Sequence, residues 1–341
     1  MGIKLSLAAV LGLVLAAYIG VTAAGLYHFF GVSLPYLAIS LFLGGVVYRV
    51  LKWARAPVPF RIPTTAGQEK SMPWVKHSRF DNPSTKGETV VRMLLEVFLF
   101  RSLFRNTKFE IEKGPRIFYQ WEKWLWLAGL AFHYCFLVIL IRHLRFFTEP
   151  VPFFVQGIEK LDGFFQVGLP GIYVTDGIFM LAVTYLIIRR LIIPQVRYIS
   201  LPQDYFPLFL LFAIGTTGIL TRYVIKVDLI KVKTLAMGLI SFHPVVPAGI
   251  GAIFFIHLAL VSTLFAYFPF SKLMHAGGIF LSPTRNLPND SRMRRHINPW
   301  NYPVKVHTYA QYEDHFREKM VEAGLPVEKE LEQAPPVAGK P

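Results

Sequence analysis

Residues 124–144 read WLWLAGLAFHYCFLVILIRHL. This apolar stretch is long enough to cross a bilayer as an α-helix. It nevertheless carries two histidines, His133 and His143. An imidazole is costly in hydrocarbon unless something satisfies its ring nitrogens, so an intramembrane histidine is a candidate functional residue.

A later apolar stretch, Ala248 to Leu273, brings a second pair of histidines, with His257 inside it and His275 just beyond its end. On an α-helix the eighteen-residue step from His257 to His275 is five turns, or roughly 27 Å. The ten-residue step between the first two histidines covers only about 15 Å.

Antiparallel packing of the two stretches would set His133 level with His275, and His143 level with His257. Each level then offers two imidazoles to one iron, which predicts two stacked bis-histidine sites near opposite membrane faces. The unequal steps require tilted helices or an irregular turn, and Pro269 is the place where we expect it.

The steps of ten and eighteen residues resemble those of the gamma subunit of respiratory nitrate reductase, a membrane cytochrome b whose helices hold two b haems. The core from Leu34 to His275 is similar to that fold. The resemblance implies an all-α integral membrane protein with two haem b groups, whose iron ligands are His133, His143, His257 and His275.

Other segments resemble the M subunit of the Dsr (DsrMKJOP) complex associated with sulfite reduction. These segments are an extra N-terminal helix, a long segment after the second span, and the tail. The long segment reads PVPFRIPTTAGQEKSMPWVKHSRFDNPST followed by EVFLFRSLFRNTKFE, and the tail reads NPWNYPVKVHTYAQYEDHFREKM. This resemblance implies quinol chemistry near the outer face, with menaquinol as the quinol. It also implies a cytoplasmic iron–sulfur partner like the K subunit, together with other Dsr subunits. Either direction of electron flow is compatible with these residues.

Composition also indicates a membrane protein, since 53% of the residues are hydrophobic and the mean hydropathy is +0.43. The formal charge of +15 is expected in cytoplasmic loops rather than on a nucleic-acid surface. The single cysteine, Cys135, excludes an intramolecular disulfide and a protein-held iron–sulfur cluster, which normally needs four cysteines. Any such cluster must belong to a partner.

The apolar segments predict six transmembrane helices, at 5–27, 34–53, 121–147, 172–193, 205–225 and 248–270. The expected parts are an N-terminal hairpin (1–53), a basic cytoplasmic loop (54–118), a four-helix dihaem core (119–275) and a cytoplasmic tail (276–341). Within the loop, residues 87–103 have an amphipathic helical pattern. Such a helix can lie at the membrane interface, receive a partner, or simply cover its own loop.

Lysine and arginine predict the orientation. Residues 52–116 contain thirteen such residues against six acids, and residues 272–305 contain six against one. The alternate loops are sparse, with two between residues 145 and 171 and three between residues 226 and 247. We therefore expect a multi-pass protein of a prokaryotic cytoplasmic membrane with both termini in the cytoplasm.

Several residues inside the spans are candidates for cofactor contacts. Arg142 and Arg222 suit the anionic propionates of an outer haem, although long basic side chains also snorkel to the headgroups. Asp176 is expected to pair with one of them or to pass a proton. Gly215 and Gly218 allow close approach by a helix or a macrocycle.

A quinone site needs an apolar slot and polar groups for the head. The outer loop 148–175 offers four phenylalanines together with Lys160 and Asp162. By the resemblance, quinol chemistry lies beside the outer haem, which makes Lys160 and Asp162 candidate head-group contacts. An amphipathic outer cap would have the same composition.

Two alternatives to a Dsr-type subunit remain open. One is a gamma subunit of a nitrate-reductase-type complex, which differs in its partner. The other is a permease or plain membrane anchor without haem. The sequence shows no evident inverted repeat and no pair of broken helices, and these features would be expected of a transporter.

Overall fold

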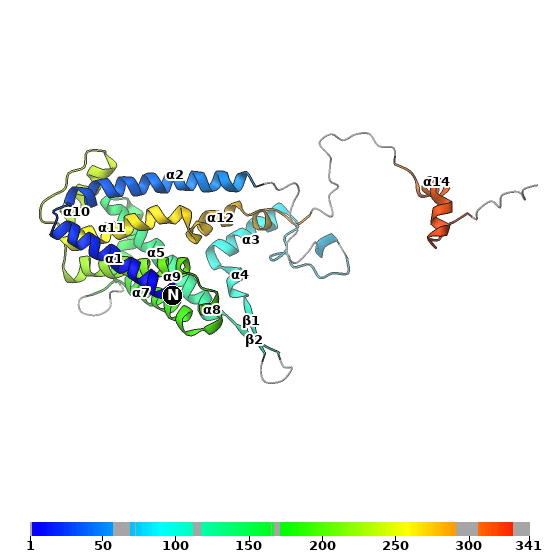
Figure 1. Ribbon diagram of the computed structural model, residues 1–341, viewed down its shortest axis with the longest axis horizontal. Helices are drawn as coiled ribbons and strands as arrows, with labels where there is room; N and C mark the ends of the chain where they lie inside the picture. The colour runs from blue at the N-terminus through cyan, green and yellow to red at the C-terminus, as the bar shows by residue number, and fades with distance from the viewer. Residues whose placement is uncertain are drawn as a thin grey trace, which may run out of the picture. The chain divides into compact units, whose positions relative to one another are not determined.

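Helices make up most of the chain in the computed structural model (Figure 1). The structure describes residues 2–56, 69–71, 73–111, 117–164, 166, 171–290 and 306–329. It divides into two units, Met1–Asp290 and Ser291–Pro341. The membrane-type helices all belong to the first unit.

Within the described residues, five helical runs are long and apolar enough to cross a membrane. They are α1 (Gly2–Thr22); Phe29–Ala54, formed by η1 (Phe29–Ser33) and α2 (Leu34–Ala54); Lys123–Phe146, formed by α5 (Lys123–His143) and η3 (Leu144–Phe146); Pro202–Val224, formed by α9 (Pro202–Ile219) and η4 (Leu220–Val224); and Ala252–Phe270, formed by α11 (Ala252–Tyr267) and η5 (Phe268–Phe270). These runs coincide with five of the six predicted spans.

The remaining predicted span, 172–193, corresponds to α7 (Val174–Ile192). It is a single helix, but it carries Asp176, Arg189 and Arg190, so it is less apolar than the other five. The six-helix count therefore stays a prediction, whereas a multi-pass helical bundle is what the structure has.

Packing between the long helices forms a single bundle. Helix α1 packs on α9 and α11, α2 on α11, and α5 on α7, while α7 and α11 both contact α9. Two buried apolar clusters hold these contacts together, one including Val21, Leu210, Leu235, Phe255 and Leu260, the other including Cys135, Phe179, Val183 and Leu211. Because lipid tails are as apolar as these side chains, close van der Waals packing rather than removal from water holds the helices together.

The helix that follows His257 is broken before it reaches His275. After η5 the chain is extended at Ser271, which has φ −114° and ψ 180°, and then continues as η6 (Lys272–Met274) and α12 (His275–Leu281). Pro269 lies at the break, because proline cannot donate a helical hydrogen bond and its ring crowds the preceding turn. The predicted irregularity is confirmed.

The basic loop differs from the all-α expectation. It contains α3 (Lys86–Leu99), α4 (Arg101–Phe104) and an antiparallel hairpin of β1 (Thr107–Ile111) and β2 (Ile117–Trp121). A single helix over 87–103 is wrong, because Phe100 adopts a left-handed φ of 50° that ends α3. A span starting at Trp121 is also wrong, because aromatic and β-branched residues favour strand pairing there.

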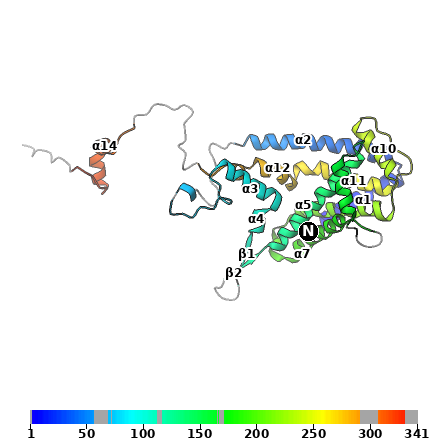
Figure 2. The same ribbon diagram turned by 180° about the vertical axis from the view of Figure 1, so that it is seen from behind.

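Shorter elements complete the described chain: η2 (Glu69–Ser71), α6 (Phe153–Phe164), α8 (Pro194–Ile199), α10 (Leu229–Ile240), α13 (Pro283–Asn286) and, in the second unit, α14 (Tyr309–Glu322). Figure 2 shows α3, α4 and the hairpin at the end of the bundle opposite α10. Loops predicted on different sides of the membrane thus lie at different ends of the bundle.

Candidate functional site

The structure brings together His133 of α5 and His275 at the start of α12, although 142 residues separate them in sequence. Their ring centroids are 6.1 Å apart and their planes are inclined at 83°. A metal bound by two imidazoles at about 2 Å from each nitrogen would put the ring centroids roughly 6 Å apart. The separation therefore fits one shared iron, and this is the pair that antiparallel packing predicts.

Three of the four candidate histidines bond a backbone carbonyl through Nδ1. The bonds run from His133 to Gly129 O (2.7 Å), from His143 to Ile139 O (2.7 Å) and from His275 to Lys272 O (2.8 Å). A carbonyl oxygen can only accept, so Nδ1 must carry the proton in each neutral ring. Nε2 then keeps its lone pair, which is the arrangement that a metal-ligating histidine needs.

His257 reaches the same state through a side chain. Its Nδ1 lies 3.0 Å from Thr217 Oγ1. That hydroxyl donates to Ala213 O at 2.8 Å, so its oxygen accepts from the imidazole. All four histidines thus fit axial ligation through Nε2, and their role as iron ligands stays a prediction.

The pair of His143 and His257 is less closely assembled than the pair of His133 and His275. In the described part of the chain, the rings of His143 and His257 make no contact with each other, unlike those of His133 and His275. Gly218 makes room for His257, since a Cβ on this glycine would lie 3.3 Å from the imidazole Cε1. At Gly215 a Cβ would lie 2.9 Å from Phe179 Cε1. The absence of a side chain at Gly215 therefore lets α7 pack closely on α9.

Arg142 contacts two carboxylates. Its Nη1 lies 3.2 Å from Asp162 Oδ2, and its Nη2 donates to Asp176 Oδ1. The predicted pairing of Asp176 with one of the two arginines is confirmed. Arg142 is buried, and its Nε has no hydrogen-bond partner in the described part of the chain. Its role toward a haem propionate stays a prediction.

Two tyrosines that the sequence did not single out extend this cluster. The Tyr223 hydroxyl donates to Asp176 Oδ2 at 2.6 Å, and the Arg222 Nη2 donates to the Tyr173 hydroxyl at 2.7 Å. The guanidinium carbons of Arg142 and Arg222 lie 4.5 Å and 4.4 Å from the centroid of the Tyr173 ring. Tyr223 follows Arg222 in the sequence, which is too common a pattern to mark it, and Tyr173 stands between two apolar residues, so only the fold identifies them.

Lys160 and Asp162 lie in different surroundings. Asp162 is buried and also accepts from the Thr175 hydroxyl at 2.6 Å. Lys160 is exposed and lines a surface groove of about 590 Å³ with Gln156, Glu159, Gly163, Phe164 and Tyr173. Because Tyr173 belongs to both, the groove adjoins the charged cluster, and the quinone roles of Lys160 and Asp162 stay predictions.

The bundle and its paired histidines define a multi-pass helical membrane protein. Residues 92–291 match the model of the family described as nitrate reductase gamma subunit. The Hdr-like menaquinol oxidoreductase cytochrome b-like subunit of Archaeoglobus fulgidus is 49% identical over 279 residues, covering 80% of this chain and 83% of that protein. Its counterpart in Archaeoglobus profundus is 45% identical over 283 residues, covering 81% and 83%. The chain belongs to the nitrate reductase gamma subunit family.

Proposed function

We propose that this chain is the membrane cytochrome b subunit of a menaquinol-linked oxidoreductase complex and that it carries two b-type haems. The observation that carries the proposal is the inner histidine pair. His133 and His275 lie 6.1 Å apart, and each ring has its Nδ1 engaged by a backbone carbonyl. The names of the Archaeoglobus relatives, a cytochrome b-like subunit of a menaquinol oxidoreductase, support it.

In this proposal His133 and His275 hold an inner haem, and His143 and His257 hold an outer one. When bound, the two haems supply one-electron carriers at two depths of an insulating layer. The protein contributes orientation, because each Nδ1 hydrogen bond restricts rotation of its ring and raises the basicity of Nε2. Along α5 the ligands are about 15 Å apart.

Quinol oxidation is proposed at the outer groove lined by Lys160 and Tyr173. Menaquinol loses two protons and two electrons on conversion to menaquinone, so the site needs groups that accept protons. Lys160 would contact the head group, and the Asp162 and Asp176 carboxylates pair with Arg142, which stacks on the Tyr173 ring. Reverse flow, with menaquinone reduced at the same place, uses the same residues.

The soluble partner is proposed to be a cytoplasmic iron–sulfur subunit like the K subunit of the Dsr complex, in dissimilatory sulfur metabolism. The chain's single cysteine, Cys135, is buried and cannot hold a cluster. The family match equally admits a nitrate-reductase-type partner. Purifying the native complex and identifying its cytoplasmic subunits separates the two.

Haem content of single-histidine variants tests the proposal. We expect each of His133→Ala, His143→Ala, His257→Ala and His275→Ala to lose one haem. Loss of an outer ligand should block reduction by quinol, whereas loss of an inner ligand should leave an outer haem that quinol reduces. His243→Ala is the matched control, since this histidine is exposed and bonds Ser241 O.

Four variants that all keep two haems would disprove the ligand assignment. A purified chain without a b-type α-band in its reduced-minus-oxidised spectrum would instead indicate a membrane anchor or permease.

A further inference from the structure

Helix α3 exposes its apolar face and buries its polar one. Val90, Val91, Leu94 and Phe98 are 58%, 42%, 51% and 54% exposed. Thr89 and Glu96, on the opposite side of the helix, are 4% and 7% exposed. A helix on the surface of a water-soluble domain shows the reverse pattern.

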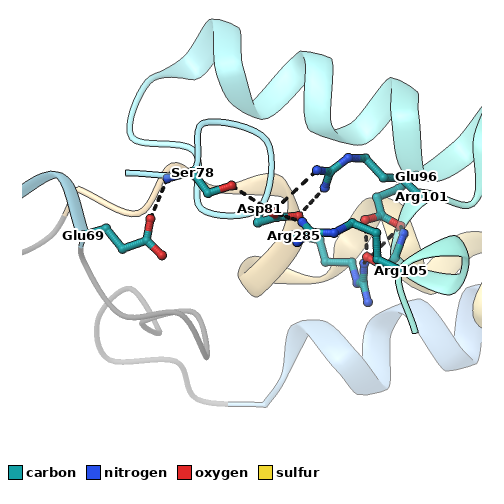
Figure 3. Close-up of polar contacts among 8 residues, drawn as sticks. Glu69, Ser78, Asp81, Glu96, Arg101, Arg105 and Arg285 are labelled. Atoms are coloured by element: carbon teal, nitrogen blue, oxygen red, sulfur yellow. Dashed lines mark hydrogen bonds and ion pairs between the residues drawn. The ribbon is translucent and has the colours of Figure 1, made fainter. Parts of the chain in front are cut away.

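The polar face is held by neighbouring elements, which determines the direction in which the apolar face points (Figure 3). The buried Glu96 carboxylate accepts from the Ser102 backbone N–H at 3.2 Å and pairs with Arg285 at 3.5 Å. One turn earlier, Arg92 donates to Thr284 O at 3.3 Å. These contacts tie α3 to α4 and α13, so its apolar face is directed away from both.

A second ion cluster holds the chain that leads into α3 (Figure 3). The Asp81 carboxylate accepts from Arg101, Arg105 and the Ser78 hydroxyl. Partial burial alone would raise the pKa of Asp81, but these hydrogen bonds outweigh it and hold the pKa well below the ordinary value. Asp81 therefore stays ionised and keeps α4 joined to this loop at neutral pH.

The junction of α3 and α4 lies at the depth of a membrane span. Four contacts join it to residues 126–134 of α5: Trp126 Nε1 to Leu99 O (2.7 Å), the Tyr134 hydroxyl to Phe98 O (3.0 Å), the Phe100 ring edge-on to His133 (4.9 Å between centroids), and Leu103 beside Gly129, where a Cβ would lie 3.5 Å from it. These α5 residues lie roughly 4–16 Å along the helix from Lys123. The junction thus lies beside the first three turns of the span.

We propose that α3 is an interfacial helix whose exposed face, formed by Val90, Val91, Leu94 and Phe98, lies against the headgroup–acyl boundary of the bilayer. The occupant is lipid because α3 is hydrogen-bonded to α5 through Trp126 and Tyr134. Exposed apolar residues of α5 near these contacts in the sequence, Leu127 and Leu137, must themselves meet lipid. An interfacial helix buries its apolar side about 5–10 Å into that boundary. This inference goes beyond the proposed function and needs no haem.

Nitroxide labels on the full chain in nanodiscs test this placement. Cys135 is buried, so the unmodified chain provides the unlabelled background. Val91→Cys and Leu94→Cys report on the apolar face. Leu137→Cys, at an exposed apolar position of α5, is the lipid reference, and Lys86→Cys, at the exposed start of α3, is the aqueous reference.

Labels at Val91 and Leu94 should resemble the Leu137 label, with relaxation enhanced several-fold more by oxygen than by a water-soluble nickel chelate. The Lys86 label should show the opposite preference. Apolar-face labels that respond to nickel like the Lys86 label overturn the proposal. The proposal is also overturned if the labels at Val91 and Leu94 are shielded from nickel only when the cytoplasmic subunits are present, whether or not lipid is there. This face would then bind a protein partner.

Discussion

Replacing Arg142 by methionine should strongly destabilise the end of the bundle where α5, α6 and α7 meet. The guanidinium is buried between Asp162 and Asp176, whose side chains are only 4% and 13% exposed. Without it, the two buried carboxylates lose the guanidinium that pairs with both of them. Breaking a buried ion pair by removing one partner costs about 3–5 kcal/mol, and Arg142 serves two partners at once.

Part of this cost is offset by hydrogen bonds that survive the substitution. Asp162 keeps the Thr175 hydroxyl at 2.6 Å, and Asp176 keeps the Tyr223 hydroxyl at 2.6 Å. A hydrogen bond to a charged group contributes about 1.5–3 kcal/mol. These two bonds therefore lower the free-energy cost of leaving the carboxylates without Arg142, but they do not remove it. We therefore expect a loss near the lower end, about 3 kcal/mol.

The assay is reversible unfolding of the chain in mixed micelles, with Asp162→Asn and the double variant measured beside Arg142→Met. Neutralising one carboxylate in the absence of Arg142 should recover about 1–3 kcal/mol, the coupling expected of residues in one charged network. A loss below about 1 kcal/mol for Arg142→Met, or strictly additive effects in the cycle, would refute the argument.

Three further predictions concern other parts of the chain. Gly218→Val should displace His257 and remove the haem proposed at His143 and His257, while the haem proposed at His133 and His275 is kept, as measured by haem content. Asp81→Asn should increase protease cleavage of the basic loop near neutral pH. The difference from the unmodified chain should shrink as the pH falls below about 4, because a carboxylate with a depressed pKa stabilises the fold above its unfolded pKa and loses this effect on protonation. Phe100→Ala should lower the potential of the haem proposed at His133 and His275 in a redox titration. Loss of the ring that contacts His133 would admit water and favour the oxidised, more charged state.

Matched variants separate these effects from general damage. Gly44→Val is the control for Gly218→Val, since a Cβ at Gly44 meets nothing within 4 Å. Asp314→Asn in α14 is the control for the loop, because Asp314 also has a lowered pKa, set by Lys329 and Arg317, but lies in the other unit. Phe280→Ala changes an exposed ring on α12 and should leave the potential unchanged.

The apolar segments and their histidines are properties that the sequence alone determined. Hydrocarbon selects for runs of about 20 apolar residues whatever their neighbours, so five predicted spans coincide with helices in the structure. The break near Pro269 follows equally from local chemistry, since proline lacks the donor that the helix needs. The pairing of His133 with His275 also follows from the sequence, because antiparallel packing of the two histidine-bearing stretches places them at the same level. Their ring centroids are 6.1 Å apart.

Only the tertiary structure decided which groups meet. Arg142 takes Asp162 and Asp176, twenty and thirty-four residues away, because α6 and α7 bring them to the end of α5. Helix α3 turns its polar side inward, since Glu96 and Arg92 find Arg285 and Thr284 nearly two hundred residues later. Hydropathy averages over a segment and contains no term for contacts between distant segments. The sequence therefore predicted the spans and the pairing of Asp176 with Arg142 or Arg222, but not which of the two arginines it would be nor that Asp162 would join them.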